Sequence, residues 1–443
     1  MNKASSTRIT IFAAGSRGDV QPCVILGQGL QRAGFEVLLA APENFAGFIR
    51  EHNLRFHALR GDVQQIMAGE TGREFMEKGS ANPIKQIRAM RTMLEPVAMK
   101  MAEDLLEASR EADALIALAV FAPLSKTVAE VWKIPLINVE PTPLLPTRAF
   151  PAPGWPLQRK LGGLHNWLSG HAMLQVIWQW YRPFVNSFRL RFRLPPYSAG
   201  AFYQILSSTP LLGAYSPKVI PHPPDWPEHA QVTGYCFPDG RMEWLPPVEL
   251  ERFLEAGDPP VYVGFGSMSG RHPERLAAIV LEALAKSGQR GLLLTGWGGI
   301  RAMSPPKDVF VIDSVPHSWL FPRMAAVVHH GGAGTTAEGL RAGVPTMILP
   351  FMVDQPFWGR RVKDLGAGPE PIPQKKLNVD RLAQAMDAAV TQPAIRQRAA
   401  LLGEAIRAED GLGEAVRRIE GYLGRPGGFL QPARSDEKDR EHE

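Results

Sequence analysis

The amino-acid sequence predicts an α/β protein with two domains, each built on a doubly wound parallel sheet. Short apolar segments alternate with helix-like segments in both halves of the chain, and a proline-rich stretch separates the halves. Alternation of this kind is typical of parallel strands with helices on both faces of the sheet. A length of 443 residues fits two or three domains of ordinary size.

The first half of the chain shows this alternation clearly. Short apolar runs predict strands, and the longer amphipathic segments between them predict helices. The expected strands lie at 8–14, 36–41, 114–119 and 136–139, and the expected helices at 20–33 and 83–109. We assign residues 1–215 to this N-terminal domain.

The alternation resumes after residues 216–247, which are rich in proline and which we interpret as an extended linker. In the C-terminal domain, residues 248–395, we expect strands at 260–265, 292–295, 309–312, 325–328 and 346–349, and helices at 273–287, 335–342 and 355–365. A final helix within 396–424 could pack back on the N-terminal domain. The highly charged end, residues 425–443, is expected to be disordered.

The composition excludes several classes of protein. Apolar residues make up 45% of the chain and charged residues 21%, as in ordinary globular proteins. No run approaches the roughly 18 apolar residues of a membrane-spanning helix, and the first residues lack the pattern of a signal peptide. Two distant cysteines, Cys23 and Cys236, predict neither a metal site nor a disulfide framework. We expect a cytoplasmic protein, and a net charge of only +5 does not indicate nucleic-acid binding.

Two glycine-rich turns lie where an expected strand becomes a helix, GFGSMS at 264–269 and HHGGAGTT at 329–336. Ligands of open α/β sheets bind at such turns, where a helix N-terminus and backbone N–H groups hold anions. Neither turn carries a Walker lysine or the dinucleotide fingerprint, which argues against a P-loop enzyme and a nicotinamide dehydrogenase. For HHGGAGTT we predict a phosphate site, and for GFGSMS a simple tight turn stays open as the alternative.

These motifs resemble a known family. The segment 314–362, SVPHSWLFPRMAAVVHHGGAGTTAEGLRAGVPTMILPFMVDQPFWGRRV, resembles the donor-binding signature of nucleotide-sugar glycosyltransferases with the GT-B fold. The segment 15–49, which contains GDVQP, resembles the branch of sterol 3β-glucosyltransferases and related bacterial natural-product glycosyltransferases. The resemblance implies two Rossmann-like domains facing each other across a cleft. It also implies transfer of a hexose, glucose from UDP-glucose in the first instance, to a hydroxyl of an apolar acceptor such as a sterol or lipid.

The resemblance also implies which residues bind the donor. They are Ser16, Arg17, Gly266, Ser267, Val315, His317, His330, Gly332, Gly334, Thr335, Glu338, Asp354 and Gln355. Val315 and His317 would contact the base of the nucleotide, and Glu338 the ribose hydroxyls. His330 and the glycines and threonine after it would bind the diphosphate. The pair at 354–355 would hold the hydroxyls of the transferred sugar.

The resemblance implies that Asp19, in GSRGD after the first strand, is the general base. Other GT-B enzymes use a histidine there, but no histidine of this chain precedes His52, so we predict a base of one aspartate. The structural alternative is a helix-capping role. One displacement at the anomeric carbon inverts its configuration. The chain has no D-x-D motif, so we expect a metal-independent enzyme that neutralises its leaving group with fixed dipoles and His330.

A second feature of the sequence is a long segment without acidic residues. Residues 141–224 contain no Asp or Glu but several basic residues. Within 155–193, apolar and aromatic residues at spacings of three and four predict one helix with an apolar stripe. The stripe consists of Trp167, His171, Leu174, Trp178, Tyr181, Val185, Phe188 and Phe192. Three interpretations stay open: ordinary core, a wall of the acceptor pocket, and contact with an anionic membrane.

Other functions compete with UDP-glucose transfer. A dTDP- or UDP-deoxysugar transferase acting on a polyketide, carotenoid or glycolipid would carry the same motifs. A sugar-nucleotide epimerase needs further acid and base groups, and we find no convincing set. A non-catalytic partner is disfavoured because Asp19, His330 and the 354–355 pair occur together. The identities of the acceptor and the hexose, and the oligomeric state, stay open.

Overall fold

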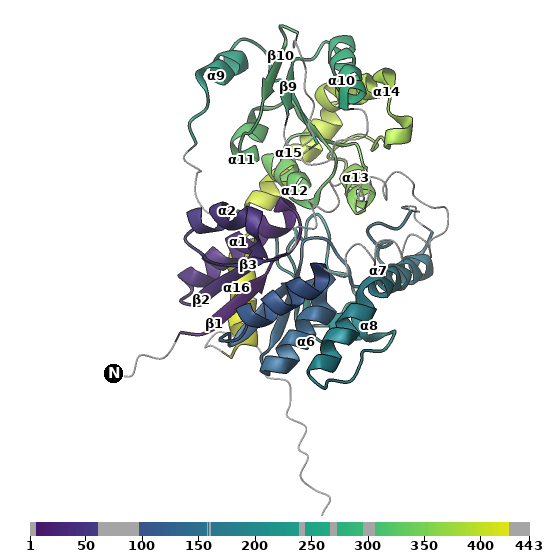
Figure 1. The fold of residues 1–443 in the computed structure, drawn as a ribbon. Coiled ribbons are helices and arrows are strands. Elements are labelled where there is room, and N and C mark those ends of the chain that lie inside the picture. Colours follow the sequence, from purple (N-terminus) through teal and green to yellow (C-terminus); the bar gives the residue numbers. More distant parts are fainter. Residues whose placement is uncertain are drawn as a thin grey trace, which may run out of the picture.

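The computed structural model describes residues 6–60, 97–156, 158, 161–238, 244–265, 273–295, 306–351 and 353–424. Two parallel sheets, of seven and five strands, form the centres of two α/β domains. Figure 1 shows the N-terminal domain, purple to teal, below the C-terminal domain in green. The predicted fold class, two doubly wound domains, is confirmed.

The N-terminal sheet has the strand order β3-β2-β1-β4-β5-β6-β7. Its strands are β1 (Arg8–Phe12), β2 (Glu36–Pro42), β3 (Arg55–Leu59), β4 (Ala114–Leu118), β5 (Leu136–Glu140), β6 (Leu211–Gly213) and β7 (Ala230–Val232). All pairings are parallel, and Ile9 of β1 lies opposite both Val37 and Ala114. The central strands β1, β4 and β5 are buried almost throughout, as continuous apolar runs in a parallel sheet should be.

Helices cover both faces of this sheet. They are α1 (Arg17–Arg32), α2 (Ala46–Glu51), α6 (Ala122–Trp132), α7 (Gly163–Arg191) and α8 (Ala201–Leu206), with 3₁₀ turns η1 (Glu43–Phe45) and η2 (Ala119–Phe121). Residues 97–108 are also helical, in agreement with the end of the helix expected at 83–109, whose first part lies outside the described residues. Helix α1 begins three residues earlier than expected, because Ser16 caps it.

The C-terminal sheet repeats the same architecture with the order β10-β9-β8-β11-β12. Its strands are β8 (Val261–Gly264), β9 (Gly291–Leu294), β10 (Val309–Ile312), β11 (Ala326–His329) and β12 (Thr346–Ile348). Its helices are α9 (Val248–Glu255), α10 (Pro273–Ser287), α11 (His317–Leu320), α12 (Ala333–Ala342), α13 (Gln355–Asp364) and α14 (Val379–Thr391), with η3 (Phe321–Arg323) and η4 (Gln374–Lys376). The ends of the predicted strands of this half differ from these by at most one residue, and the strand expected at 309–312 is observed with those bounds.

The segment expected as a linker, 216–247, is part of the sheet at one point. Strand β7 lies within it and pairs with β6, Leu211 opposite Ala230. The three residues of β7 are too few to show an alternation of apolar and polar side chains, so their pairing could not be predicted from the sequence. The extended connection between the domains therefore begins only after β7.

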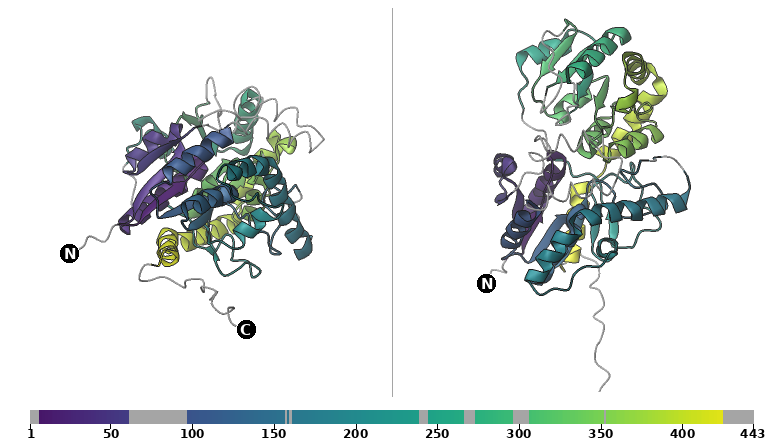
Figure 2. Two further views of the ribbon diagram at one scale, coloured as in Figure 1. Left: turned by 60° about the horizontal axis from the view of Figure 1, so that its bottom comes forward. Right: turned by 45° about the vertical axis from the view of Figure 1, so that its right-hand side comes forward.

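The end of the chain crosses back to the N-terminal domain. Instead of one helix within 396–424, the structure has α15 (Pro393–Arg407) on α12 and α16 (Gly411–Tyr422) on α1. Leu412 and Ile419 of α16 are buried among the core residues of the N-terminal sheet. Figures 1 and 2 show α16, in yellow, beside the purple strands and helices. The two domains are therefore linked by two crossings of the chain.

The aromatic stripe of 155–193 lies on α7 and faces the core. Leu174, Trp178, Val185 and Phe188 are at most 2% exposed. The indole N–H of Trp178 donates to Ser198 O at 3.0 Å, as a buried tryptophan requires. Core packing is thus what the structure shows for this stripe. In the described part of the chain, none of the helices has the length and hydropathy needed to cross a bilayer.

Both sheets reverse their strand order beside the first strand, between β1 and β4 and between β8 and β11. Ligands of doubly wound sheets bind outside the carboxyl ends of the strands at this reversal. The turn after β1 and the turn after β11 approach each other across the domain boundary. A Cβ atom built on Gly334 would lie 4.0 Å from the Cα atom of Gly18.

Candidate active site

Asp19 lies at the start of α1, on the face toward the C-terminal domain. Its Oδ2 atom accepts hydrogen bonds from the backbone N–H of Ser16 at 2.8 Å and from the Ser16 hydroxyl at 2.9 Å. This is a capping box with Ser16 as the N-cap and Asp19 at the third helical position. The capping role considered for Asp19 is therefore real. It also fixes the carboxylate, while the structure records for Oδ1 no partner among the described residues.

Gly15 makes this placement of Asp19 possible. Its φ of +136° is strained for any residue with a side chain. A Cβ atom there would also lie 2.5 Å from Asp19 Oδ2. The glycine in the GSRGD turn is therefore required by the aspartate that follows it.

The electrostatic environment raises the pKa of Asp19. Burial is the main cause, the two donors from Ser16 oppose it, and the negative charge of Asp354 in the other domain raises the pKa further. A raised pKa suits a carboxylate that must take a proton from a hydroxyl. The charge of Asp354 acts on Asp19 across the domain boundary, from the start of α13.

The HHGGAGTT turn joins β11 to α12. His329 is completely buried, and its Nδ1 accepts from the backbone N–H of Gly331 at 3.0 Å, so its proton is on Nε2. Gly331 has a φ of +96°, and a Cβ atom on it would meet Ile348 at 2.6 Å. His329 and Gly331 thus shape the turn, a role that the sequence did not reveal.

His330 points along the start of α12. A Cβ atom on Gly332 would lie 2.7 Å from His330 Nε2, which places the imidazole directly beside the helix N-terminus. Burial lowers the pKa of His330 to about 4, and its Nδ1 has no partner in the described structure. The ring is therefore neutral near pH 7 and carries one N–H that an anion at the helix N-terminus can accept.

The first turn of α12 carries the other predicted phosphate ligands. Gly332 is the N-cap, and Gly334 and Thr335 follow in the first turn. The Thr336 hydroxyl is bonded to Gly332 O at 2.9 Å, whereas no bond of the Thr335 hydroxyl is recorded within the described ranges. The structure thus groups Gly332, Gly334 and Thr335 with His330 at one helix N-terminus. Gly266 and Ser267 lie outside the described residues.

The segment expected at the nucleotide base lies beside this turn. Val315 is buried in the core of the C-terminal domain, with 7% of its surface exposed. His317 begins α11, stacks on Phe321 with ring centroids 4.4 Å apart, and contacts the hydroxyl of Tyr262 at 3.2 Å. Burial lowers the pKa of His317 to about 4, helped by the positive charge of Arg17 from the N-terminal domain. His317 and Arg17 therefore lie on facing sides of the domain boundary.

Arg17 and Glu338 complete the predicted set on either side. Arg17 is exposed, with its guanidinium 4.6 Å from the ring centre of Phe48 and its Nε bonded to Gln21. Glu338 lies one turn into α12, and burial raises its pKa to about 7 in spite of Arg341 nearby. A carboxyl group of this kind favours partners that donate hydrogen bonds, such as hydroxyls.

Asp354 lies at the start of α13 and is held from both domains. Its Oδ2 accepts from the Trp358 indole at 3.0 Å and from the Thr142 hydroxyl at 2.9 Å. Burial raises the pKa of Asp354 against these two donors. Gln355 is buried, and its Oε1 accepts from the backbone N–H of Phe351 at 2.7 Å, which closes the loop before α13.

Thr142 and Glu140 are site residues that the sequence did not suggest. Glu140 ends β5, and its carboxyl group accepts from the Tyr215 hydroxyl at 2.8 Å and from the Leu144 N–H at 3.0 Å. These bonds anchor the loop that presents Thr142 to Asp354. Burial raises the pKa of Glu140 to about 7, so much of it is protonated at neutral pH. The one available signal was their position at the carboxyl end of a central strand.

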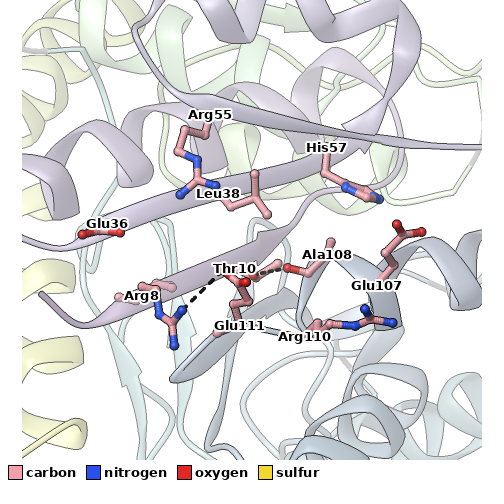
Figure 3. A pocket seen from close by; sticks show the side chains of 12 residues that line it. Arg8, Thr10, Glu36, Leu38, Arg55, His57, Glu107, Ala108, Arg110 and Glu111 are labelled. Carbon is pink, nitrogen blue, oxygen red and sulfur yellow. Dashed lines mark hydrogen bonds and ion pairs between the residues drawn. The ribbon is translucent and has the colours of Figure 1, made fainter. Parts of the chain in front are cut away.

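The C-terminal domain offers hydrogen-bond donors for a diphosphate at the start of α12. Both domains contribute a carboxylate, Asp19 from one and Asp354 from the other. Within the described part of the chain, no three His, Cys, Asp or Glu side chains gather as a metal site requires. A separate cavity of about 270 Å³ lies at the opposite, amino-terminal edge of β1, β2 and β3 (Figure 3). It is lined by charged side chains such as Arg8, Arg55 and Glu36, and it takes no part in the interdomain site.

The two-domain architecture and the paired turns define the class of GT-B enzymes, and comparison with known proteins agrees. Residues 9–151 match the N-terminal domain of glycosyltransferase family 28. Residues 299–421 match the C-terminal domain of the erythromycin biosynthesis protein CIII-like family. A glycosyltransferase of kitacinnamycin has a similar fold, with a TM-score of 0.70 at 22% identity over 94% of this chain and 99% of its own.

Two curated relatives are plant enzymes. The chain is 38% identical over 94% of its length to sterol 3-beta-glucosyltransferase UGT80A2 of Arabidopsis thaliana. It is 37% identical over 98% of its length to UGT80B1 of the same plant. The chain spans 66% of the length of the first and 71% of the second.

A bacterial relative matches nearly end to end. O-mycaminosyltylonolide 6-deoxyallosyltransferase of Streptomyces fradiae is 38% identical, over 93% of this chain and 97% of its own. The chain therefore belongs to the GT-B glycosyltransferases of the family 28 and UDP-glycosyltransferase type. The resemblance drawn from the sequence is confirmed.

Proposed function

We propose that this glycosyltransferase moves glucose from UDP-glucose to a hydroxyl of an apolar acceptor such as a sterol, with inversion at the anomeric carbon. The observation that carries the proposal is the meeting of three features across the domain boundary. Asp19 comes from one domain, and His330 and Asp354 come from the other. The names of the plant relatives support the donor sugar and the acceptor class.

The donor would lie along α12 and α13. The diphosphate would rest on the helix N-terminus at Gly332–Thr335, where backbone N–H groups and the helix dipole favour negative charge. His330 would donate its one N–H to the same oxygens. Glu338 would accept hydrogen bonds from the ribose hydroxyls. Asp354 would accept hydrogen bonds from the hydroxyls of the sugar, and Gln355 would accept or donate hydrogen bonds there.

Asp19 would act on the acceptor. Its free Oδ1 takes the proton of the acceptor hydroxyl while the acceptor oxygen attacks the anomeric carbon. The bond from that carbon to the diphosphate breaks, and UDP leaves with the electron pair. A single displacement turns an α-linked donor into a β-glycoside. General base catalysis of this kind contributes about 10²–10⁴ in rate.

The leaving group would need no metal ion. The dipole of α12, its first-turn N–H groups and His330 would neutralise the charge that develops on UDP. Undiminished transfer in the presence of a strong chelator such as EDTA supports this point, and restoration of lost activity by Mg²⁺ would contradict it.

A deoxysugar transferase is the second candidate. The bacterial relative that matches nearly end to end is named for transfer of a 6-deoxy sugar to a macrolide. The solved glycosyltransferase VinC, similar in fold with a TM-score of 0.65 at 19% identity over 93% of this chain and 98% of its own, was crystallised with dTDP. Under this alternative the same residues would bind a dTDP-linked sugar.

Calorimetric titration of the purified protein with UDP, dTDP and NAD distinguishes these functions. We expect UDP to bind, dTDP to bind more weakly and NAD not to bind. His330→Ala should weaken UDP binding about tenfold, as expected for a hydrogen bond to a charged group. Tighter binding of dTDP would favour the deoxysugar function, and absence of nucleotide binding would contradict both.

A further inference from the structure

Glu140 is a completely buried carboxyl group that the proposed reaction does not use. It ends β5, whose other residues are buried as well. Burying a carboxyl group is unfavourable unless hydrogen bonds replace the water that it loses. Each oxygen of Glu140 has one such bond. Oε1 accepts from the Tyr215 hydroxyl at 2.8 Å, and Oε2 accepts from the Leu144 N–H at 3.0 Å.

The two donors come from different parts of the domain. Leu144 belongs to the loop after β5, whereas Tyr215 follows β6, the next strand of the sheet. Glu140 and Gly213 are partners across these two strands. A Cβ atom on Gly213 would lie 2.6 Å from Cζ of the Tyr215 ring, so the ring lies directly on the strand. The Glu140 carboxyl group therefore ties the loop to the sheet.

The tied loop is a short turn with Thr142 at its centre. Pro141 and Pro143 flank Thr142, and each proline fixes its own φ near about −65°. Neither proline has an N–H, so Leu144 supplies one of only two backbone donors between 141 and 144. From the middle of this turn the Thr142 hydroxyl donates to Asp354 Oδ2 of the other domain at 2.9 Å.

We propose that Glu140 is a positioning residue for the donor sugar: its carboxylate holds the turn 140–144 so that Thr142 fixes Asp354. The proposal rests on the proposed function, in which Asp354 accepts hydrogen bonds from hydroxyls of the sugar. Glu140 is fully buried and acts only through the turn.

The strength of this hold depends on the charge of Glu140. A carboxylate accepts charge-assisted hydrogen bonds, which are about twice as strong as neutral ones. The protonated group makes only neutral bonds to the same partners, and its own proton then competes with that of the Tyr215 hydroxyl. Protonation of Glu140 should therefore loosen the turn and weaken the binding of the sugar.

This protonation falls near neutral pH. Burial raises the pKa of Glu140 to about 7, while the Leu144 N–H and the Tyr215 hydroxyl lower it. Tyr215 is the titratable group that faces Glu140, and Tyr235 acts on Tyr215 in turn. Among the described residues, no charged side chain contributes to the pKa of Glu140. Because the pKa is raised, the carboxylate forms, and holds the turn, only as the pH rises through about 7.

Calorimetric titration with UDP-glucose, without an acceptor, tests the proposal. Glu140→Gln keeps the shape of the side chain and is neutral at every pH. The ratio of its Kd to that of the wild type should be near one at about pH 6, where the wild-type group is also neutral. The ratio should rise to about fivefold at about pH 8, the difference between a charged and a neutral hydrogen bond. This ratio cancels the titration of groups that both proteins share.

UDP, which lacks the sugar, is the control ligand. It should bind Glu140→Gln and the wild type equally at both pH values. In a Thr142→Val background Glu140→Gln should have no further effect on UDP-glucose, because the turn no longer reaches Asp354. A ratio for UDP-glucose that does not change with pH, or equal weakening of UDP, would overturn the proposal.

Tyr215→Phe tests the same carboxyl group by a second route. It removes a donor that lowers the pKa of Glu140, so the pH at which the ratio changes should move upward when Glu140→Gln is compared within that background. Tyr235→Phe is the matched control, since the hydroxyl of this buried tyrosine has no partner within the described ranges. A downward shift in Tyr215→Phe, or the same shift in Tyr235→Phe, would contradict the assignment.

Failure of the proposed function gives a different result. If the wild type bound dTDP-glucose and not UDP-glucose, the proposed donor would be wrong, and a ratio that rises with pH for dTDP-glucose would still support the role of Glu140. If the wild type bound neither nucleotide sugar, both proposals would fall.

Discussion

Thr142 of the N-terminal domain donates a 2.9 Å hydrogen bond to Asp354 of the C-terminal domain. The two residues are 212 positions apart in the chain, and the bond joins the loop after β5 to the start of α13. Glu140 accepts hydrogen bonds from the Tyr215 hydroxyl and from the Leu144 N–H, which anchors the loop that carries Thr142. One domain thus positions a residue that the other would use to bind the donor sugar.

Replacing Thr142 should affect the sugar and spare the nucleotide. In Thr142→Val the shape is kept and the donor to Asp354 is lost. A hydrogen bond to a charged group contributes about 1.5–3 kcal/mol, so we expect KM for UDP-glucose to rise by at least about tenfold. Steady-state kinetics measures this change, and calorimetry with UDP, which lacks the sugar, should show unchanged affinity.

Thr142→Ser is the matched control for that variant, because it keeps the hydroxyl. It should restore most of the affinity for UDP-glucose. If Thr142→Val weakened UDP itself to the same degree, Thr142 would act on domain packing and not on the sugar end of the site.

Neutralising Asp354 should shift the pH dependence of catalysis. The charge of Asp354 raises the pKa of Asp19, so Asp354→Asn should lower that pKa. The base would then stay deprotonated to lower pH, and the acidic limb of the kcat/KM profile should move to lower pH even though the rate itself falls. Asp364→Asn, on the last turn of the same helix, is the control. A shift to higher pH would contradict the interaction between the two carboxylates.

Gly15→Ala should displace Asp19, the proposed general base. The added methyl group would collide with Asp19 Oδ2 at 2.5 Å, in a backbone conformation with a φ of +136°. We expect kcat to fall by about 10²-fold or more, the contribution of a positioned general base, with near-normal affinity for UDP. Gly47→Ala is the control, because nothing lies within 4 Å of a Cβ atom there. Full activity in Gly15→Ala would remove Asp19 from the reaction.

Binding of UDP should bring a proton to His330. Burial holds the pKa of the free histidine at about 4, and a bound diphosphate favours the protonated ring. At pH 6 the protein should therefore take up a fraction of a proton on binding, and affinity should fall as pH rises. Titrations in buffers of different ionisation enthalpy measure this uptake. It should vanish in His330→Asn, which does not titrate, and equal uptake in that variant would assign the proton to another group.

Much of the fold could be predicted from the sequence because its strands are buried on both faces. Such strands are continuous apolar runs, and β8, β10 and β11 were expected within one or two residues of their observed ends. Strands β6 and β7 have three residues each, which is too short for a recognisable side-chain pattern. The same limit produced the overlong linker.

The site divides in the same way. Asp19, His330 and Asp354 follow strands or begin helices in recognisable motifs, and their turns come together because the strand order reverses there. Glu140 ends β5 and Thr142 follows it in the same manner, but no motif marks them. Their roles depend on a contact between distant segments, which only the structure reveals. The sequence pointed to His330 at the phosphate turn, but the structural role of His329, which is completely buried and accepts from Gly331 N–H, had no signal in it.

The most direct test of the central claim is the anomeric configuration of the product. Purified protein is incubated with UDP-glucose and a sterol, and the glycoside is analysed by proton NMR of its anomeric hydrogen. The account predicts a β-glucoside from the wild type and a loss of about 10²–10⁴ in rate in Asp19→Asn. An α-glucoside, or a β-glucoside formed at the wild-type rate by Asp19→Asn, would contradict it.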